Sequence, residues 1–154
     1  MVDAKALVLA CLTVSLCAGC APPPGPAGPA PVRSVAPDAP LNGGRWELVA
    51  IRSMDDRVLA PGEPGLYTLS FEGDGRLTVR ADCNRGRGTW SSAGPGQVRL
   101  GPLATTRAMC APGSFHERFL SELGYVRSYR HEGGRLFLAT LADGSIIELR
   151  PWRG

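Results

Sequence analysis

Among the side chains in this sequence of 154 residues, those of the cysteines can take part in the most kinds of chemistry. Three of the five, Cys11, Cys17 and Cys20, lie in the first twenty residues, and Cys83 and Cys110 follow far downstream. The spacing of Cys83 and Cys110 is much wider than a Cys-x-x-Cys redox motif. In an exported domain two such cysteines most simply form one disulfide, and a redox-active or metal-binding thiol pair is the alternative.

The start of the chain predicts export. Lys5 precedes an uncharged run of about a dozen residues, the length of a signal-peptide core and too short to span a bilayer. The pattern Cys17-Ala18-Gly19-Cys20 resembles the bacterial lipobox, whose cysteine becomes acylated. Two or more acyl chains hold a protein stably on a membrane. We therefore expect residues 1–19 to be removed and Cys20 to carry the anchor, facing the periplasm or the cell exterior; an ordinary signal peptide cut near Ala18 or Ala21 is the alternative.

The histidines and serines do not form a recognisable catalytic motif. His116 and His131 lack a second histidine four residues later, so the zinc-protease pattern is missing. Ser114, Ser121 and Ser145 lack a Gly-x-Ser-x-Gly setting, and the sequence places no histidine as a base for them. We expect no enzyme activity, no metal site and no cofactor.

A polar patch is the strongest candidate for ligand binding. If Cys83 and Cys110 are bonded, their polar neighbours flank one location, and arginine there offers forked donors to a carboxylate or phosphate. The alternative is structural, because asparagine suits left-handed turns and threonine suits strand edges. The patch consists of Asn84, Arg85, Thr105, Thr106 and Arg107.

The segment Gly86-Arg87-Gly88 has two interpretations. Glycine lets backbone N–H groups approach a phosphate, which would suit an anion-binding loop. The segment lacks the Lys-Ser/Thr ending of a P-loop and falls between expected strands. We therefore expect a bend or bulge in a sheet.

Composition divides the chain into three parts. Eight of the 14 prolines lie in residues 21–40, a stretch without aromatic residues, which indicates an extended spacer. We expect a signal peptide at 1–19, a tether at 20–41 and one domain at 42–154. Removal of Lys5 and Asp3 with the signal leaves the net charge at +3, and the arginines are scattered, so we expect no nucleic-acid partner.

Short strands joined by turns dominate the domain. Tyr67, Leu69 and Phe71 alternate with polar residues, the period of a strand with one dry face, and Asp74-Gly75 predicts a hairpin turn. The same reasoning predicts further strands at 46–51, 76–80, 89–91, 97–100, 125–130, 135–141 and 145–150, with turns at Gly133-Gly134 and Asp143-Gly144.

One helix is expected near residue 115. Ser114 and Glu117 have the capping-box spacing, Phe119 and Leu123 belong to an apolar stripe, and Gly124 is a natural stop. The predicted fold is therefore mainly β with one α-helix: a small antiparallel curved sheet or barrel that the helix covers or plugs.

The order of these features resembles the META domain family, which includes HslJ-like bacterial lipoproteins. The likeness covers about residues 42–151. It depends on an opening Trp46-Glu47-Leu48, on Asp82-Cys83-Asn84-Arg85 before Gly86-Arg87-Gly88, and on the segment from Leu103 to Cys110, which contains Thr-Arg-x-Met-Cys. Asp82 departs from the pattern, since the family often has a small residue there.

The resemblance implies a compact β-rich fold and a role in cell-envelope stress, and it implies no reaction. We therefore expect a non-enzymatic envelope lipoprotein, a monomer that acts in stress tolerance or envelope maintenance by binding a protein or small molecule. The alternative is a carrier that holds a small apolar ligand inside a β-barrel. A carrier needs an internal cavity, whereas a barrel filled by Leu69, Phe71, Phe119 and Leu138 has none.

Overall fold

A computed structural model describes residue 41 and residues 43–141 and 144–154. The predicted signal peptide, Cys20, all but the last residue of the predicted tether, and Asp143 of the predicted last turn lie outside the described residues. In the described part the elements are β1 (Gly44–Ser53), β2 (Val58–Leu59), β3 (Tyr67–Phe71), β4 (Arg76–Ala81), β5 (Asn84–Ser91), β6 (Arg99–Leu100), β7 (Ala104–Thr105), α1 (His116–Tyr125), β8 (Val126–Glu132), β9 (Arg135–Thr140) and β10 (Ser145–Pro151).

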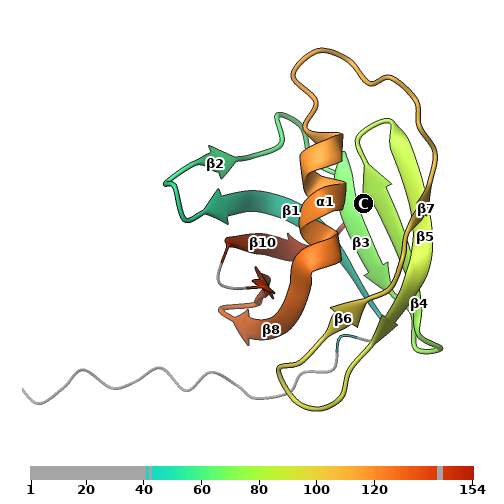
Figure 1. Ribbon diagram of the computed structural model, residues 1–154, viewed down its shortest axis with the longest axis vertical. Coiled ribbons are helices and arrows are strands. Elements are labelled where there is room, and N and C mark those ends of the chain that lie inside the picture. The colour runs from blue at the N-terminus through green and yellow to red at the C-terminus, as the bar shows by residue number, and fades with distance from the viewer. Residues whose placement is uncertain (1–40, 42, 142–143) are drawn as a thin grey trace, which may run out of the picture. The chain divides into compact units, whose positions relative to one another are not determined.

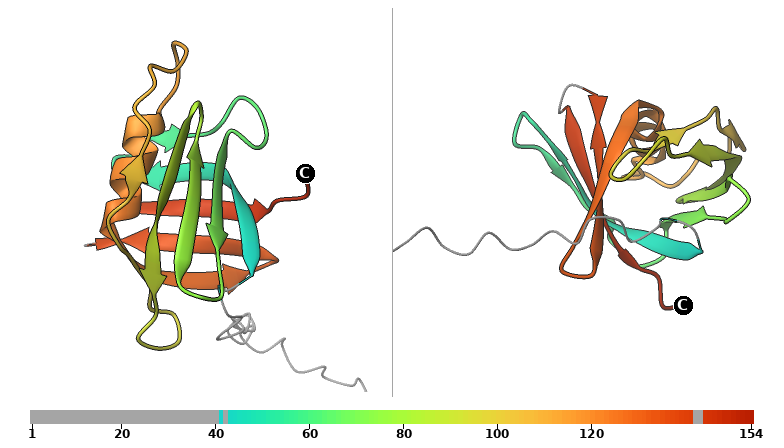
Figure 2. Two further views of the ribbon diagram at one scale, coloured as in Figure 1. Left: turned by 90° about the vertical axis from the view of Figure 1, so that its right-hand side faces the viewer. Right: turned by 90° about the horizontal axis from the view of Figure 1, so that it is seen from below.

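The strands form one antiparallel sheet in the order β6-β5-β4-β3-β1-β10-β9-β8, with β2 paired to β1 and β7 paired to β5 (Figure 1). Strands β3, β4 and β5 run across β10 and β9, and β1 pairs with both β3 and β10, so the sheet is strongly coiled (Figure 2). The register shifts once between β1 and β10 and once between β8 and β9, and such bulges bend strands. The predicted antiparallel curved sheet is confirmed.

The two ends of the sheet nearly close into a barrel. Gln97, just before β6, forms an isolated bridge with Ser128 of β8. The backbone N–H of Val98 donates to the carbonyl of Arg127 over 3.2 Å. The barrel is therefore closed by one bridge between the region of β6 and β8, a weaker connection than the paired strands elsewhere in the sheet.

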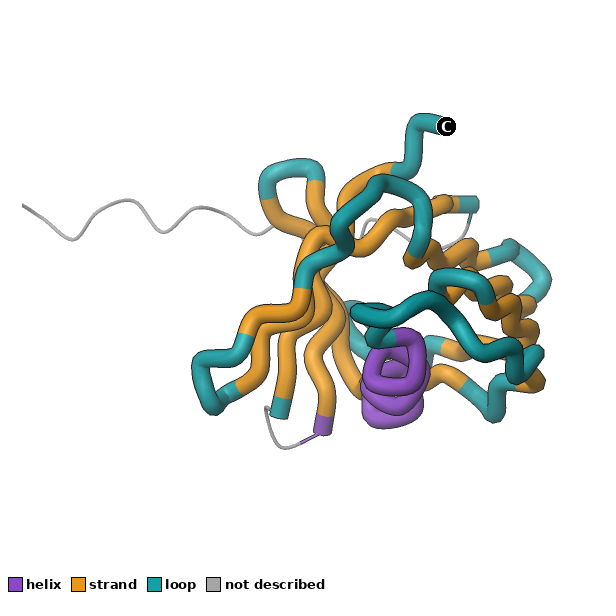
Figure 3. The backbone as a smooth tube through the Cα atoms, turned by 90° about the horizontal axis from the view of Figure 1, so that it is seen from above, coloured by secondary structure: helices purple, strands orange, loops and turns teal. Residues whose placement is uncertain are grey.

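The coiled sheet has two arms, one formed by β3, β4 and β5 and the other by β10, β9 and β8. Helix α1 fills the space between these two arms (Figure 3). Phe119 and Leu123, the core positions of its apolar stripe, are fully buried. They meet Leu69, Phe71 and Leu138 of the strands in one hydrophobic cluster, and each of those side chains is also at most 1% exposed. The helix therefore completes the core, as the sequence predicts.

The hairpin at Asp74-Gly75 has the predicted form. Gly75 adopts a φ of +84°, a region that glycine enters without steric cost. The Asp74 carboxylate accepts the backbone N–H of Arg76 and closes the turn. Leu69 then lies opposite Val79, and both face the core.

The glycines of Gly86-Arg87-Gly88 differ from the expectation. They lie in the middle of β5, which pairs with β4 in unbroken register, so the predicted bend or bulge is wrong. A Cβ at Gly88 would lie 2.7 Å from the carbonyl oxygen of Pro102. The glycines allow the segment before β7 to cross close above β5.

The ends of the helix also differ. Phe115 occupies the N-cap position and no side chain caps it, so the predicted Ser114–Glu117 capping box is not formed. The helix runs through Gly124 to Tyr125, so Gly124 is not the stop. The chain leaves the helix directly into β8, and this strand pairing ends it.

Candidate functional site

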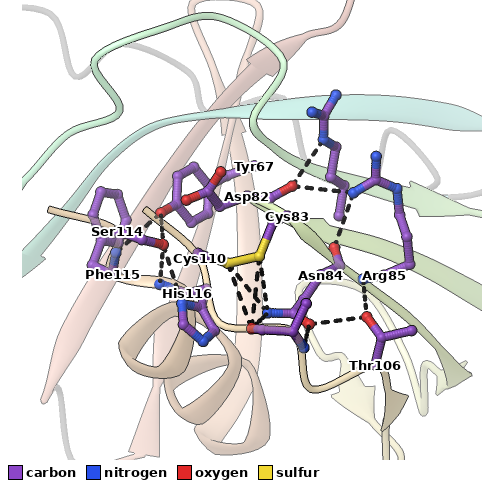
Figure 4. Close-up of a disulfide and its surroundings, with 12 residues drawn as sticks. Tyr67, Asp82, Cys83, Asn84, Arg85, Thr106, Cys110, Ser114, Phe115 and His116 are labelled. Atoms are coloured by element: carbon purple, nitrogen blue, oxygen red, sulfur yellow. Dashed lines mark hydrogen bonds between the residues drawn. A yellow bond between two sulfur atoms is a disulfide. The ribbon is translucent and has the colours of Figure 1, made fainter. Parts of the chain in front are cut away.

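A disulfide joins the two cysteines of the domain (Figure 4). Cys83 and Cys110 are 27 residues apart in sequence, and their Cα atoms are 5.5 Å apart. Cys83 lies in the turn between β4 and β5, where Asp82 has a φ of +57°. Cys110 lies in the loop that leads to α1. The bond therefore fastens this loop to the start of β5.

Asn84 fastens the same loop with hydrogen bonds. Its Oδ1 accepts from the backbone N–H of Ala108 at 2.8 Å and from the hydroxyl of Thr106 at 2.9 Å. Its Nδ2 donates to the carbonyl of Ala108 at 3.0 Å. The residue is 1% exposed, so its amide serves the loop and is not offered to a ligand.

Thr106 is engaged in the same way. Its hydroxyl accepts the backbone N–H of Arg85 at 3.0 Å, and its own N–H donates to the carbonyl of Arg85 at 2.9 Å. These bonds extend the pairing of β7 with β5. Asn84, Thr106 and the disulfide together form what we call the loop clamp.

The start of α1 is positioned by aromatic contacts. The ring of Tyr67 stacks on Phe115 with centroids 4.3 Å apart, and its hydroxyl accepts the backbone N–H of Phe115. The Tyr67 hydroxyl also lies 3.3 Å from Ser114 Oγ. Strand β3 therefore determines where the helix begins.

A groove of about 580 Å³ runs between the clamped loop and α1. Met109, on the loop, is 99% exposed, and Leu120 of the helix is partly buried. The groove thus combines apolar and charged surface. Its lining residues are Asn84, Thr105, Thr106, Arg107, Ala108, Met109, His116, Glu117 and Leu120.

The structure divides the predicted polar patch. Four of its five residues line the groove. Arg85 does not, because it follows Asn84 in β5 and successive side chains of a strand point to opposite faces. Arg85 lines a second hollow on the outer face of β4 and β5, which shares Thr105 and Thr106 with the groove.

One contact in the site was missed from the sequence. Ser114 Oγ lies 3.1 Å from His116 Nδ1, so a histidine does stand beside one of the serines (Figure 4). Ser114 also accepts the N–H of His116 at 3.4 Å, the local pattern by which a serine organises a turn two residues ahead. Ser114 and His116 are only two residues apart, and this short spacing was the signal in the sequence that could have predicted the contact.

Two buried carboxylates of the strands were also missed. Glu47 of β1 accepts the N–H of Gly65 at 2.9 Å and pairs with Arg150 at 2.6 Å. Glu148 of β10 pairs with Arg52 and Arg135. Both carboxylates are 5% exposed and fully partnered, so they join strands. An acidic residue within an apolar strand was the signal for each.

Metal ligands do not gather in the described part of the chain: no three His, Cys, Asp or Glu side chains are placed to hold an ion there. Among the same residues, no helix has the length and apolar character needed to cross a membrane.

Two solved structures share this fold. One is the NMR structure of a protein from Burkholderia xenovorans, at 22% identity and a TM-score of 0.61, with 74% of this chain and 85% of that chain covered. The other is the crystal structure of a DUF4847 family protein from Bacteroides vulgatus, at 18% identity and a TM-score of 0.51, with 71% and 93% covered. No curated protein matches the chain.

The family assignment comes from the sequence match. The family model described as META domain matches residues 39–151, which is most of the chain and includes every described element. The two segments that carried the resemblance, around Cys83 and Cys110, are the ones that the disulfide and Asn84 hold together. The chain belongs to the META domain family.

Proposed function

We propose that this protein is a non-enzymatic lipoprotein of the cell envelope that binds a partner through the groove beside α1, in stress tolerance or envelope maintenance. The observation that carries the proposal is the exposed Met109 on a loop that the clamp holds in place. An exposed apolar side chain gains free energy when a partner covers it, and a loop that is already ordered loses little entropy on binding.

The groove offers mixed chemistry to a partner. Arg107 and Glu117 supply opposite charges on its two sides, and Met109 and Leu120 supply apolar contact. Methionine adapts its shape to varied apolar surfaces, which suits protein recognition. A protein segment with an apolar anchor and flanking polar groups fits this description.

Packing argues against the carrier alternative. The barrel positions that would face a ligand are occupied by Leu69, Phe71, Phe119 and Leu138, each at most 1% exposed. These side chains contact one another in one cluster. The groove, in contrast, is open to solvent.

Site-specific cross-linking tests the proposal. A photoreactive amino acid placed at position 109 should give a discrete cross-linked product in stressed cells. The matched control is position 54, where Met54 is also exposed, at 73%, and lies outside the groove. Equal products at positions 54 and 109, or none at either, would contradict binding at the groove.

The anchor needs its own test. Mass spectrometry of the protein from membranes should find an acylated N-terminal Cys20. Cells that carry Cys20→Ala in place of the native protein should lose resistance to envelope stress and release the domain from the membrane. An unmodified N-terminus at residue 21 would remove the anchor from the proposal.

The Ser114–His116 contact permits a direct test for hydrolase chemistry. An activated serine reacts with fluorophosphonate probes, whereas a serine that only shapes a turn does not. We expect no labelling of Ser114. Labelling that Ser114→Ala abolishes would replace a binding role with an enzymatic one.

A further inference from the structure

Three arginines share the outer face of β4 and β5. Arg80 of β4 lies directly opposite Arg85 of β5, and Thr78 lies directly opposite Arg87. Residues paired in this way point to the same face, as do residues two apart in one strand. We call Arg80, Arg85 and Arg87 the arginine ladder.

The ladder places like charges close together. Like charges directly opposite on neighbouring strands repel each other. The Nε of Arg80 and an Nη1 of Arg85 both donate to the backbone carbonyl of Asp82, each at 3.1 Å, so two guanidinium groups converge on one oxygen. A bound anion would offset the repulsion between these groups.

Arg76, on the same face of β4, is neutralised, unlike the arginines of the ladder. Arg76 lies two residues before Thr78 in β4 and forms an ion pair with Asp74 at 2.7 Å. In residues 43–141 and 144–154, Arg80, Arg85 and Arg87 form no ion pair. The charge of the ladder therefore stays available to an anion.

A hollow lies where the anion would bind. It has a volume of about 440 Å³ and is lined by Thr78, Arg85 and Arg87 together with the edge of β7. Guanidinium groups form paired hydrogen bonds with phosphate oxygens, and a threonine hydroxyl can donate one more. Arg85 and Arg87 lie on the opposite face of β5 from Asn84, and the hollow meets the groove only at Thr105 and Thr106, which line both.

We propose that the arginine ladder is a binding site for the phosphate group of an organic phosphate ester, carried either by a free ester or by a lipid headgroup. The hollow holds the guanidinium groups of Arg85 and Arg87 on β5 and the hydroxyl of Thr78 on β4, and Arg80 lies directly opposite Arg85. This inference does not depend on the groove or on the anchor.

NMR of the arginine Nε–Hε groups tests it. The full 154-residue chain in micelles of an uncharged detergent is titrated first with glycerol 3-phosphate and then with phosphatidylglycerol added to the micelles. Saturable shifts at Arg80, Arg85 and Arg87 with glycerol 3-phosphate support a free ester. Shifts only with phosphatidylglycerol support a headgroup.

A charge-matched control separates recognition from general attraction. The ladder variant Arg80→Gln/Arg85→Gln/Arg87→Gln should bind at least about tenfold more weakly, because a charged hydrogen bond contributes about one such factor. A control variant that replaces Arg57, Arg130 and Arg153 loses the same charge and should bind like the native protein. No saturable shift with either probe, or equal weakening in the two variants, would overturn the site.

Discussion

The loop clamp predicts an energetic coupling between a disulfide and a buried amide. The variant Asn84→Ala removes three hydrogen bonds of 2.8–3.0 Å that hold Thr106 and Ala108. Each such bond contributes about 1 kcal/mol net. Thr106 and Ala108 are exposed, so water replaces part of the loss, and we expect a cost of about 2 kcal/mol.

The disulfide contributes by a different route. Closing the loop between Cys83 and Cys110, which are 27 residues apart, stabilises the fold by about 3–4 kcal/mol on the chain-entropy account. The bond also keeps Ala108 beside Asn84. Once Cys83→Ser/Cys110→Ser frees the loop, Asn84→Ala should cost only about 1 kcal/mol, because the loop spends less time in position.

Urea unfolding measures this cycle. The four proteins are the native chain, Asn84→Ala, the double serine variant and the combined variant, followed by tryptophan fluorescence. Gln97→Ala, an exposed polar residue, controls for loss of an amide and should change stability by less than about 0.5 kcal/mol. An Asn84→Ala cost that is the same in both backgrounds, or below about 0.5 kcal/mol in the native one, would refute the clamp.

Three further outcomes follow from single contacts. Phe119→Ala should lower stability by about 3–5 kcal/mol in thermal unfolding, because the side chain is fully buried between the two arms of the sheet. Gly88→Ala should cost about 1–3 kcal/mol, since its Cβ would lie 2.7 Å from a backbone oxygen, whereas Gly62→Ala, with nothing within 4 Å, should cost much less. The pKa of Asp74 lies below its ordinary value, mainly because its carboxylate accepts the backbone N–H of Arg76. A carboxylate with a lowered pKa stabilises the fold at pH values above its unfolded pKa, and this stabilisation is lost as the pH falls through the folded pKa. The variant Arg76→Gln keeps the backbone N–H but removes the side-chain contacts with Asp74. An NMR titration of this variant should therefore find the Asp74 pKa raised only part of the way back to its ordinary value.

Local patterns were enough to predict most of the longer strands of this fold, but not β2, β7 or the part of β5 before residue 89. The alternation at Tyr67, Leu69 and Phe71 follows from a face that must be dry, and the Asp74-Gly75 turn follows from a φ that only glycine adopts freely. These features need only a few neighbouring residues. They were therefore visible in the sequence.

Features set by distant residues were not predictable in the same way. The Ser114 hydroxyl, expected to cap the helix, lies instead between Tyr67 and His116, and Tyr67 is 47 positions earlier. The need for glycine at position 88 arises from the carbonyl of Pro102, in a segment that crosses the strand. Both depend on the tertiary fold.

The division of the polar patch was predictable in principle. Asn84 and Arg85 were grouped because both flank the expected disulfide, yet adjacent residues of a strand face opposite sides. The period-two alternation of a strand that starts at Asn84 separates the buried amide of Asn84 from the exposed guanidinium of Arg85.

Strand β5 therefore carries two surfaces with different chemistry. On one side Asn84 holds the loop that presents Met109, and on the other Arg85 and Arg87 form the arginine ladder. Because the arginines contribute no side chain to the groove, neutralising the ladder should leave cross-linking from position 109 unchanged. Asn84→Ala should weaken that cross-linking and leave the phosphate titration as it was. If the ladder variant altered the cross-linking, or if Asn84→Ala altered the phosphate titration, the two sites would be one site, coupled through the backbone of β5.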